Sequence, residues 1–237
     1  MTAFVRGGDP STPPAVLAAQ AAQALDGATA QEIVQWAADT FDDRLCVTSS
    51  MTDAVLVDLV SKVQPGVDVI FLDTGYHFAE TIGTRDAVAA SLPVNVITVE
   101  PKHTVAEQDA AYGTKLHDRD PDRCCAMRKV EPLRRSLEPY HAWISGIRRD
   151  ESESRRNVRV VDWDAKRGLV KINPIAAWTE SDVDEYASEN GVLINPLVQL
   201  GYASIGCAPC TRPVAEGEDA RAGRWAGRSK TECGLHV

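Results

Sequence analysis

The sequence lacks any long hydrophobic run and any recognisable targeting segment. No uninterrupted apolar stretch approaches the roughly 20 residues that a membrane-spanning helix needs. The Ala- and Gln-rich start also lacks the basic end, apolar run and cleavage site of a signal peptide. These absences argue against a membrane protein and indicate a cytoplasmic one.

The chain also lacks a basic excess, since 25 Lys and Arg stand against 34 Asp and Glu and leave a net charge of −9. A nucleic-acid binder takes most of its affinity from a basic surface, so this composition argues against a nucleic-acid partner. An anionic ligand must therefore meet a local basic cluster. Three segments are rich in Lys and Arg: 122–135, 146–156 and 218–230.

Arginines suit phosphate and sulfate oxygens because the guanidinium group forms forked hydrogen bonds. Arg221, Arg224 and Arg228 recur at three- and four-residue intervals, which would align them on one face if their segment were helical. Lys129 and Arg224 are the preferred candidates for ligand binding. The following arginines are expected on solvated faces: Arg134, Arg135, Arg155 and Arg156.

Apolar periodicity predicts strands that alternate with helices, and 237 residues with 44% apolar content suffice for one main domain. We expect helices at 15–25, 30–41, 53–63, 77–91, 124–139 and 179–191, and strands at 44–50, 67–74, 94–100 and 141–147. The alternation predicts an α/β fold with a parallel sheet flanked by helices. Residues 1–14, rich in Gly, Pro, Ser and Thr, are expected to form a disordered leader.

Three polar segments each follow a predicted strand: SSMTD (49–53), LDTG (72–75) and SGIRRDES (145–152). Ligands of open parallel sheets sit beyond the carboxyl ends of the strands, so these segments are expected to converge on a binding site. Taken singly, each could equally be an ordinary polar turn.

The six cysteines include two pairs. Cys124 and Cys125 are adjacent, with Cα atoms about 3.8 Å apart, which is below the roughly 4.4 Å lower end of disulfide geometry. Cys207 and Cys210 form C-A-P-C, a spacing found at metal and cluster sites. A tandem Cys-Cys fits zinc badly, so a 4Fe-4S cluster is the better prediction. The alternative is that the tandem pair is buried as small apolar residues and C-A-P-C is a redox dithiol.

The last cysteine, Cys233, lies in the terminal stretch TECGLHV. Arg228 and Lys230 precede it and His236 follows, and this electropositive setting favours the thiolate, the form that attacks. A nucleophile is one interpretation, and an incidental terminal thiol is the other.

Four stretches together resemble the assimilatory adenylylsulfate (APS) reductase family, relatives of the PAPS reductases: CCAMRKVEPL, CAPCTRP, GEDARAGRW and ECGLH. The resemblance runs from about residue 44 to the end. It implies an adenine-nucleotide-hydrolase-like α/β fold and the reduction of APS by thioredoxin to sulfite and AMP. It also implies a domain at 15–216 that binds nucleotide and an iron-sulfur cluster, followed by a mobile tail at 217–237 that carries the nucleophile.

The family pattern assigns roles to particular residues. Cys233 is implied as the nucleophile that forms an S-sulfocysteine. The 4Fe-4S ligands are implied to be Cys124, Cys125, Cys207 and Cys210. The substrate-binding residues are implied to be Ser49, Ser50, Leu72, Asp73, Thr74, Gly75, Lys129, Gly146, Arg148, Arg149, Arg221, Arg224 and His236.

Three other readings remain open on the sequence. A PAPS reductase would use the same tail cysteine, although those enzymes typically lack both cysteine pairs. A cluster-dependent tRNA thiolation enzyme of the same superfold is disfavoured by the acidic charge and by SSMTD, which lacks the glycines of an ATP-pyrophosphatase loop. The third is a zinc-stabilised binding module. Whether the chain forms a homo-oligomer is not indicated.

Overall fold

The computed structural model describes residues 12–228 and 230–235. The predicted leader therefore lies mostly outside the described residues, and so does His236. The helices are α1 Pro14–Ala24, α2 Ala30–Phe41, α3 Val55–Val63, α4 Ala79–Ser91, α5 Val105–Tyr112, α6 Leu116–Arg119, α7 Pro121–Cys125, α8 Glu131–Ser136 and α9 Glu180–Asn190. The strands are β1 Leu45–Thr48, β2 Asp68–Leu72, β3 Asn95–Val99, β4 Ala142–Ser145, β5 Val161–Asp164 and β6 Leu169–Ile172.

These strands form one sheet in the order β3-β2-β1-β4-β6-β5. All neighbouring pairs are parallel except β5 with β6, which are antiparallel. The predicted parallel α/β sheet is therefore confirmed. The β5–β6 hairpin at the sheet edge was not predicted. Its strands are only four residues long, and in β5, VDWD, every second residue is an aspartate, so the apolar signal is weak.

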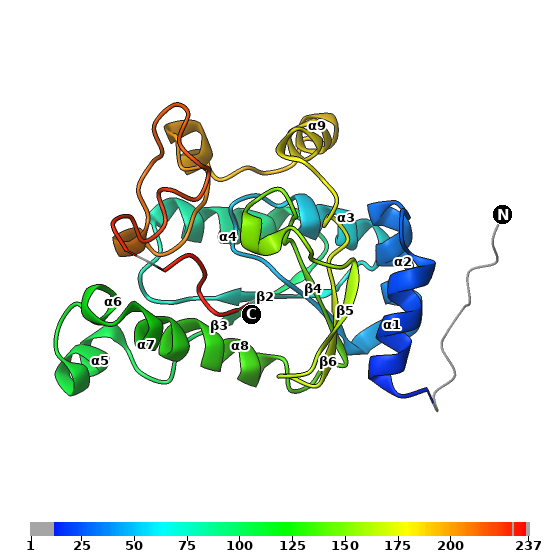
Figure 1. Ribbon diagram of the computed structural model, residues 1–237, viewed down its shortest axis with the longest axis horizontal. Helices are drawn as coiled ribbons and strands as arrows, with labels where there is room; N and C mark the ends of the chain where they lie inside the picture. Colours follow the sequence, from blue (N-terminus) through cyan, green and yellow to red (C-terminus); the bar gives the residue numbers. More distant parts are fainter. Residues whose placement is uncertain (1–11, 229, 236–237) are drawn as a thin grey trace.

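Each central strand buries alternate side chains on opposite faces of the sheet, as a period of two requires. Val47 and Val69 pack into a large core with α1 to α4, while Cys46, Ile70 and Trp143 pack into a second core with Leu133 and Leu137 near α8. Figure 1 shows the sheet between an upper group of helices that includes α3 and α4 and a lower group from α5 to α8.

Helix ends follow the sequence signals closely. Thr29 and Glu32 form a capping box at α2, and Thr179 and Asp182 form another at α9. Gly191 ends α9 at a φ of 61°, a left-handed conformation that glycine adopts without steric cost. The predicted helix at 179–191 is thus confirmed, as α9 with Thr179 and Gly191 at its two ends.

The segment 218–230 is not helical in its described residues. Its arginines consequently point to different partners instead of sharing one helix face. Arg221 donates to the carbonyl of Thr231, Arg224 to the carbonyl of Ile205, and Arg228 pairs with Asp118. Turns replace the helix because glycines interrupt the segment, and Trp225 has a φ of 47°.

The C-terminal segment returns to the sheet. It is drawn in red in Figure 1, and it ends close to the strands in the middle of the molecule. Leu235 packs against the second core. Along the described part of the chain, no helix combines the length and the apolar character needed to cross a bilayer.

Candidate active site

A cavity of about 530 Å³ opens at the carboxyl ends of β1, β2 and β4. Its volume lies in the range of small-molecule sites, roughly 300–1,000 Å³. In the sheet, β2 and β3 lie on one side of β1, and β4 and the later strands lie on the other. The cavity therefore lies at the point where the strand order reverses. The expected substrate-binding residues that line it are Ser49, Ser50, Leu72, Thr74, Lys129, Gly146, Arg148, Arg221 and Arg224.

The loop after β1 reaches the cavity through a left-handed residue. Met51 has a φ of 58° and is fully buried. Its amide donates to Ser49 Oγ at 3.1 Å, and its carbonyl accepts a 3.0 Å hydrogen bond from Nδ2 of the buried Asn195. These two hydrogen bonds stabilise Met51 in a conformation that glycine adopts more readily. The SSMTD loop can therefore turn without a glycine and place Ser49 and Ser50 at the cavity.

Three expected substrate-binding residues do not line the cavity. Asp73 accepts a hydrogen bond from the amide of Gly75 at 2.9 Å and so shapes the turn. Gly75 has a φ of 71°, and a Cβ there would lie 3.0 Å from a guanidinium nitrogen of Arg128. Arg149 turns its guanidinium toward the carbonyl of Val158 at 2.7 Å. Each of the three supports the fold around the cavity.

The basic side chains of the cavity come from distant parts of the chain. Lys129 precedes α8, whereas Arg221 and Arg224 belong to the C-terminal turns. Burial opposes the charge of Lys129, but the nearby sulfurs of Cys207 and Cys233 outweigh it and raise the lysine pKa. Burial, with the neighbouring charge of Arg155, lowers the pKa of Arg221. The site therefore concentrates cations although the chain is acidic.

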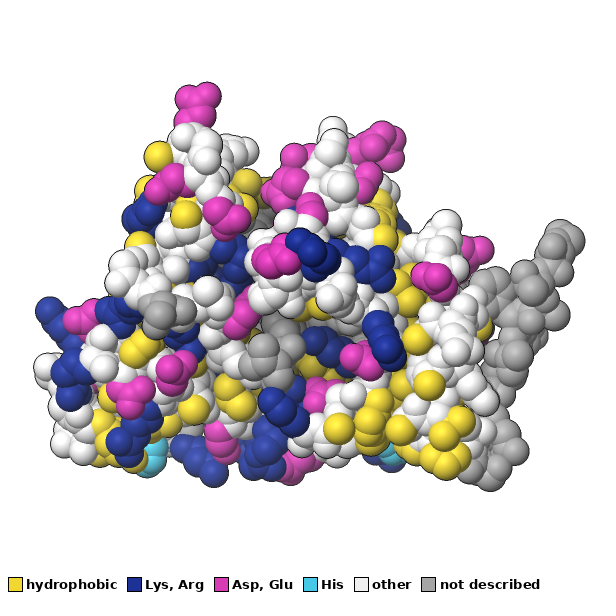
Figure 2. All heavy atoms as spheres, viewed as in Figure 1, with side chains coloured by type: hydrophobic (Ala, Val, Ile, Leu, Met, Phe, Trp, Pro, Cys, Tyr) yellow, Lys and Arg dark blue, Asp and Glu magenta, His cyan; other side chains and the backbone are white. Residues whose placement is uncertain are grey.

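The wider surface carries charges of both signs. Figure 2 shows Asp and Glu gathered over α9, whereas Lys and Arg are interspersed with Asp and Glu along the lower edge, over α5 to α8. Arg134, Arg135 and Arg156 are exposed, as predicted. The prediction for Arg155 was wrong, because its side chain is buried against two carboxylates, Glu151 and Glu232.

Several cavity residues escaped sequence reasoning. His77 lines the cavity, and its Nδ1 has no hydrogen-bond partner among the residues described, while burial lowers the pKa of its ring. The acidic lining residues were also missed: Asp53, Asp150, Glu151, Glu180 and Asp184. Two of these, Asp150 and Glu180, pair with Arg148. The available signal for Asp150 and Glu151 was the loop 148–156, in which acidic residues lie between two pairs of arginines.

Cys233 is a free, half-buried thiol in the wall of the same cavity. Residues on both sides of it are held. Glu232 forms an ion pair with Arg155 at 2.7 Å, and the Leu235 carbonyl accepts a hydrogen bond from Arg167 at 3.1 Å. The terminal cysteine thus lines the cavity near Lys129, whose pKa its sulfur helps to raise.

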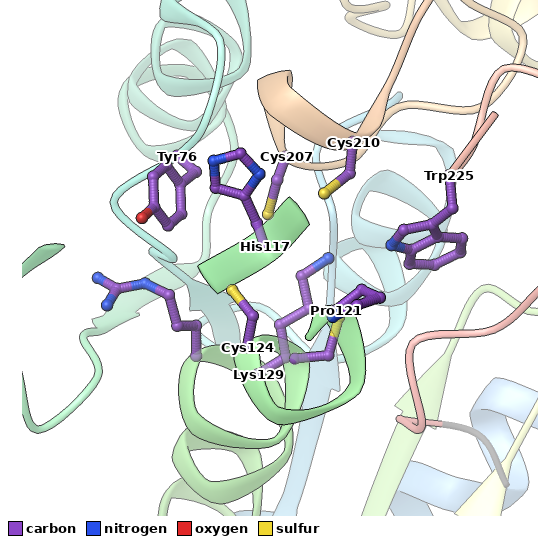
Figure 3. A pocket seen from close by; sticks show the side chains of 10 residues that line it. Tyr76, His117, Pro121, Cys124, Lys129, Cys207, Cys210 and Trp225 are labelled. Atoms are coloured by element: carbon purple, nitrogen blue, oxygen red, sulfur yellow. The ribbon is translucent and has the colours of Figure 1, made fainter. Parts of the chain in front are cut away.

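The two cysteine pairs meet in a second, smaller cavity that adjoins the first. Cys124, Cys125, Cys207 and Cys210 all line it, and Lys129 lines both cavities. Figure 3 shows the sulfurs of Cys207 and Cys210 directed from one segment toward the helix that carries Cys124, with the Lys129 amine between them. All six cysteines of the chain lie within the described residues and are free.

The helix that carries the tandem pair is interrupted at a defined point. The predicted helix at 124–139 is confirmed in part, as α7, a π-helical turn at Ala126–Val130 and α8. The amide of Glu131 donates to Ala126, five residues back, where an α-helix would use four. Pro132 lacks an amide proton and so cannot donate to Arg128, which favours a break in the α-helical pattern here. The wide turn sets the directions of Arg128 and Lys129.

Arg128 ties this helix to the turn after β2. It is buried, and it donates to the carbonyls of Thr74 and His103 and to Gln108 Oε1. Thr74 in turn has its hydroxyl 3.2 Å from the Cys207 sulfur. The Arg128 guanidinium is therefore connected through Thr74, which lines the larger cavity, to Cys207.

The donor set suits an iron-sulfur cluster. Burial, reinforced by the other cysteines, raises the pKa of Cys124 to about 12, and burial raises that of Cys125 to about 11. Such thiols ionise when metal charge is present. Within residues 12–228 and 230–235, no group of three or more His, Cys, Asp and Glu is arranged to hold one metal ion. Four cysteine thiols around one cavity match the four thiolate ligands that an iron-sulfur cluster takes.

Trp225 is a further part of this cavity that sequence reasoning missed. Its ring is buried, and its Nε1–H has no hydrogen-bond partner among the described residues. Arg224 stacks over the ring with its guanidinium carbon 4.7 Å from the centroid. Sulfur atoms of a bound cluster would be suitable acceptors for this N–H.

The sheet topology and the nucleotide-sized cavity at its switch point define an adenine-nucleotide-hydrolase-like α/β protein. The sequence model of one protein family, described as the phosphoadenosine phosphosulfate reductase domain, matches residues 44–213 of the chain. The chain belongs to this family.

Curated relatives cover nearly the whole chain. A Streptomyces coelicolor protein named adenosine 5'-phosphosulfate reductase is 69% identical over 220 residues, covering 93% of each chain. A Mycolicibacterium smegmatis protein of the same name is 57% identical over 221 residues, covering 93% of this chain and 94% of the relative.

Solved structures agree with the fold. The phosphate complex of phosphoadenylyl-sulfate (PAPS) reductase from Candida auris superposes with a TM-score of 0.70 at 30% identity, covering 81% of this chain and 94% of that one. An FMN adenylyltransferase from Candida glabrata superposes with a TM-score of 0.55 at 12% identity, covering 87% and 69%. The second likeness concerns the fold alone.

Proposed function

We propose that this chain is an oxidoreductase that reduces adenylyl sulfate (APS) to sulfite and AMP with electrons from thioredoxin. The observation that carries the proposal is that the Cys233 thiol shares one cavity with five cationic side chains, among them Lys129, Arg221 and Arg224. The names of the Streptomyces and Mycolicibacterium relatives, both adenosine 5'-phosphosulfate reductases, support it.

The substrate would lie across the strand ends. The adenosine moiety is proposed to contact residues at or just beyond the carboxyl ends of β1, β2 and β4, namely Ser49, Ser50, Leu72, Thr74, Gly146 and Arg148. The phosphosulfate would lie against Lys129, Arg221 and Arg224, with His236 assigned to the same end by family resemblance. Cationic side chains fixed there stabilise the negative charge that develops on the leaving phosphate.

The Cys233 thiolate attacks the sulfate sulfur, and a bond from Cys233 Sγ to that sulfur forms while the bond from the sulfur to the phosphate oxygen breaks. AMP leaves with the electron pair of that bond, and an S-sulfocysteine remains. A thioredoxin thiolate then attacks Cys233 Sγ, and sulfite departs with the electron pair of the sulfur–sulfur bond. The second thioredoxin thiol resolves the mixed disulfide, so the thioredoxin dithiol supplies both electrons.

A 4Fe-4S cluster would be held by Cys124, Cys125, Cys207 and Cys210. When bound, it supplies structural cross-linking of two segments and a local charge beside Lys129, while the reaction itself uses Cys233 and thioredoxin. Lys129 is the residue that lines both cavities, so it would border the cluster on one side and the substrate on the other.

APS is favoured over PAPS, the substrate named for the Candida auris relative. The two curated relatives named adenosine 5'-phosphosulfate reductase support this choice, as do the two cysteine pairs, which PAPS reductases typically lack. PAPS reduction remains the second candidate. Steady-state rates settle the choice, because a greater kcat/KM for PAPS than for APS would overturn the proposal.

The direct test is a single-turnover labelling experiment. Incubation with ³⁵S-labelled APS in the absence of reductant should leave label on the C-terminal peptide, and thioredoxin should remove it as sulfite. Cys233→Ser protein should take up no label. Absence of label from wild-type protein that turns over APS would refute the covalent route.

The remaining assignments have separate tests. Activity that needs ATP and tRNA, with none on APS, would favour the thiolation alternative, and zinc without iron or sulfide in anaerobically purified protein would favour a binding module. A cytoplasmic location suits the six free cysteines, because cytoplasmic thiols are kept reduced. Cell fractionation tests that location.

A further inference from the structure

A buried ion pair holds the residue next to the terminal cysteine. Glu232 receives two hydrogen bonds from Arg155, at 2.7 Å from Nε to Oε1 and 2.8 Å from Nη2 to Oε2. This is the bidentate geometry in which guanidinium and carboxylate bind most strongly. Arg221 lies 3.3 Å from the second carboxylate oxygen. The side chain that precedes Cys233 is thus gripped on both of its oxygens.

Arg155, the cation of this pair, is connected to the loop after β4. Arg155 also pairs with Glu151, whose carboxylate accepts a 2.9 Å hydrogen bond from the amide of Arg148. Arg148 and Glu151 belong to the loop that follows β4. A continuous set of contacts therefore runs from the end of a central strand, through Arg155, to the tail.

The pair is largely out of solvent. Side-chain exposure is 10% for Arg155 and 12% for Glu232, whereas many ion pairs on this protein are open, such as Arg212 with Glu218 at 44% and 35%. Burial alone would raise the pKa of Glu232, but the hydrogen bonds and charge of Arg155, with Arg221 and Arg224, bring it below its ordinary value. The carboxylate is therefore ionised and attracted to Arg155.

The other ionic contacts of the tail are more exposed on their acidic side. Arg228 pairs with Asp118 and Lys230 with Asp122, and the two aspartates are 57% and 83% exposed. Exposed pairs of this kind contribute little, about 0–1 kcal/mol. Among the ionic contacts of the described tail residues, the one most able to hold the thiol in the cavity is therefore the one at Glu232.

We propose that Arg155 and Glu232 form a latch that positions Cys233 in the cavity and that must open before the thiol can meet a second protein. Arg155 is a positioning residue, because it acts on the thiol through Glu232. The inference rests on the proposed function only for its kinetic consequence. Its structural consequence, how often Cys233 leaves the cavity, holds for the protein without substrate.

The two chemical steps should respond oppositely to a weaker latch. Attack on the nucleotide requires Cys233 inside the cavity, whereas attack by thioredoxin requires it outside. Glu232→Gln keeps the shape of the side chain and removes its charge. It should slow S-sulfocysteine formation in a single turnover and leave the reductive release of sulfite as fast as in the wild type or faster.

The opening itself is measured without substrate. A maleimide carrying a large polyethylene glycol cannot enter the cavity, so its rate of reaction with Cys233, followed by mass spectrometry of the C-terminal peptide, reports the open state. Glu232→Gln should raise this rate about tenfold, which corresponds to about 1.4 kcal/mol. Glu218→Gln is the matched control, since it removes the acidic partner of the exposed Arg212 pair in the same region.

A double-mutant cycle separates the latch from a general structural effect. Arg155→Gln combined with Glu232→Gln should react no faster with the reagent than Glu232→Gln alone, because both changes remove the same contact. Arg155→Gln alone leaves Glu232 its contact with Arg221 and should have the smaller effect. Arg155→Gln leaves Glu151 without its cation, so thermal melting must first show that it folds. If Arg155→Gln does not fold, the labelling rates of Glu232→Gln and Glu218→Gln are compared with each other, and that comparison alone tests the latch.

The outcomes are distinct. Equal labelling rates for wild type, Glu232→Gln and Glu218→Gln would overturn the latch even in an enzyme that is fully active on APS. A raised rate confined to Glu232→Gln would support the latch even if APS proved not to be the substrate. A fall in S-sulfocysteine formation matched by an equal fall in sulfite release would also count against it.

Discussion

Replacing Arg128 by methionine removes the guanidinium that links the cysteine helix to the turn after β2. The side chain is only 3% exposed, and it donates to the carbonyls of Thr74 and His103 and to Gln108 Oε1, where Gln108 is fully buried. Methionine is close in length and can fill the space, but it donates no hydrogen bond. Three acceptors then lose a donor in the interior.

Each buried group left unsatisfied costs about 1–3 kcal/mol. Part of that cost is returned by the added apolar burial of methionine, so we expect a net loss of about 3 kcal/mol in the free energy of unfolding. That is a large fraction of the roughly 5–15 kcal/mol that stabilises a domain. With an m-value near 3 kcal/mol per M, the urea midpoint should fall by about 1 M.

Urea unfolding followed by both tryptophan fluorescence and circular dichroism measures this change, with coincident curves as the check for two-state behaviour. The matched control is Arg134→Met, on the same helical segment but exposed and paired with Glu138, which should change stability by less than about 0.5 kcal/mol. The reasoning is refuted if Arg128→Met lowers the midpoint no more than Arg134→Met does. Iron content should fall with Arg128→Met as well, because the guanidinium connects the cysteine helix through Thr74 to Cys207.

Other substitutions probe the remaining parts of the site. Cys233→Ser should keep the fold and the iron content but form no labelled intermediate, and retained turnover would contradict the assignment of the nucleophile. Cys207→Ala should lose iron and sulfide in elemental analysis, whereas Cys46→Ala, in the core, should keep both. Burial raises the pKa of Asp53, so the folded protein binds that proton more tightly and the free energy of unfolding falls as pH rises through the folded pKa. Asp53→Asn should remove that fall, giving a higher urea midpoint than wild type at neutral pH and an equal one in acid; equal midpoints at both would disprove it.

Local signals predicted much of the fold. The parallel core strands and the helices between them follow from apolar periodicity, because burial on one or two faces repeats along each element. The capping box and Gly191 set the ends of α9 from contacts within a few residues. The β5–β6 hairpin was missed, because a strand with alternating carboxylates gains its place only by pairing at the sheet edge.

The binding-site residues were harder to predict. Asn195 escaped notice because its role, holding the left-handed Met51, depends on a hydrogen bond across 144 residues of sequence. The assignment of Arg155 to a solvated face failed for the same kind of reason, since its acidic partner Glu232 comes from the far end of the chain. Spacing along the sequence carries no information about such contacts.

The sequence by itself determined the elements, their alternation and the supply of cysteines and cations, because these depend on near neighbours and on residue type. The tertiary structure alone decided which of them meet: that Lys129 borders both cavities, that Cys233 lies among Arg221 and Arg224, and that Glu232 is held by Arg155. The physical reason is that the environment of a charged or nucleophilic group is set by what the fold packs around it, and those neighbours come from segments far apart in the chain.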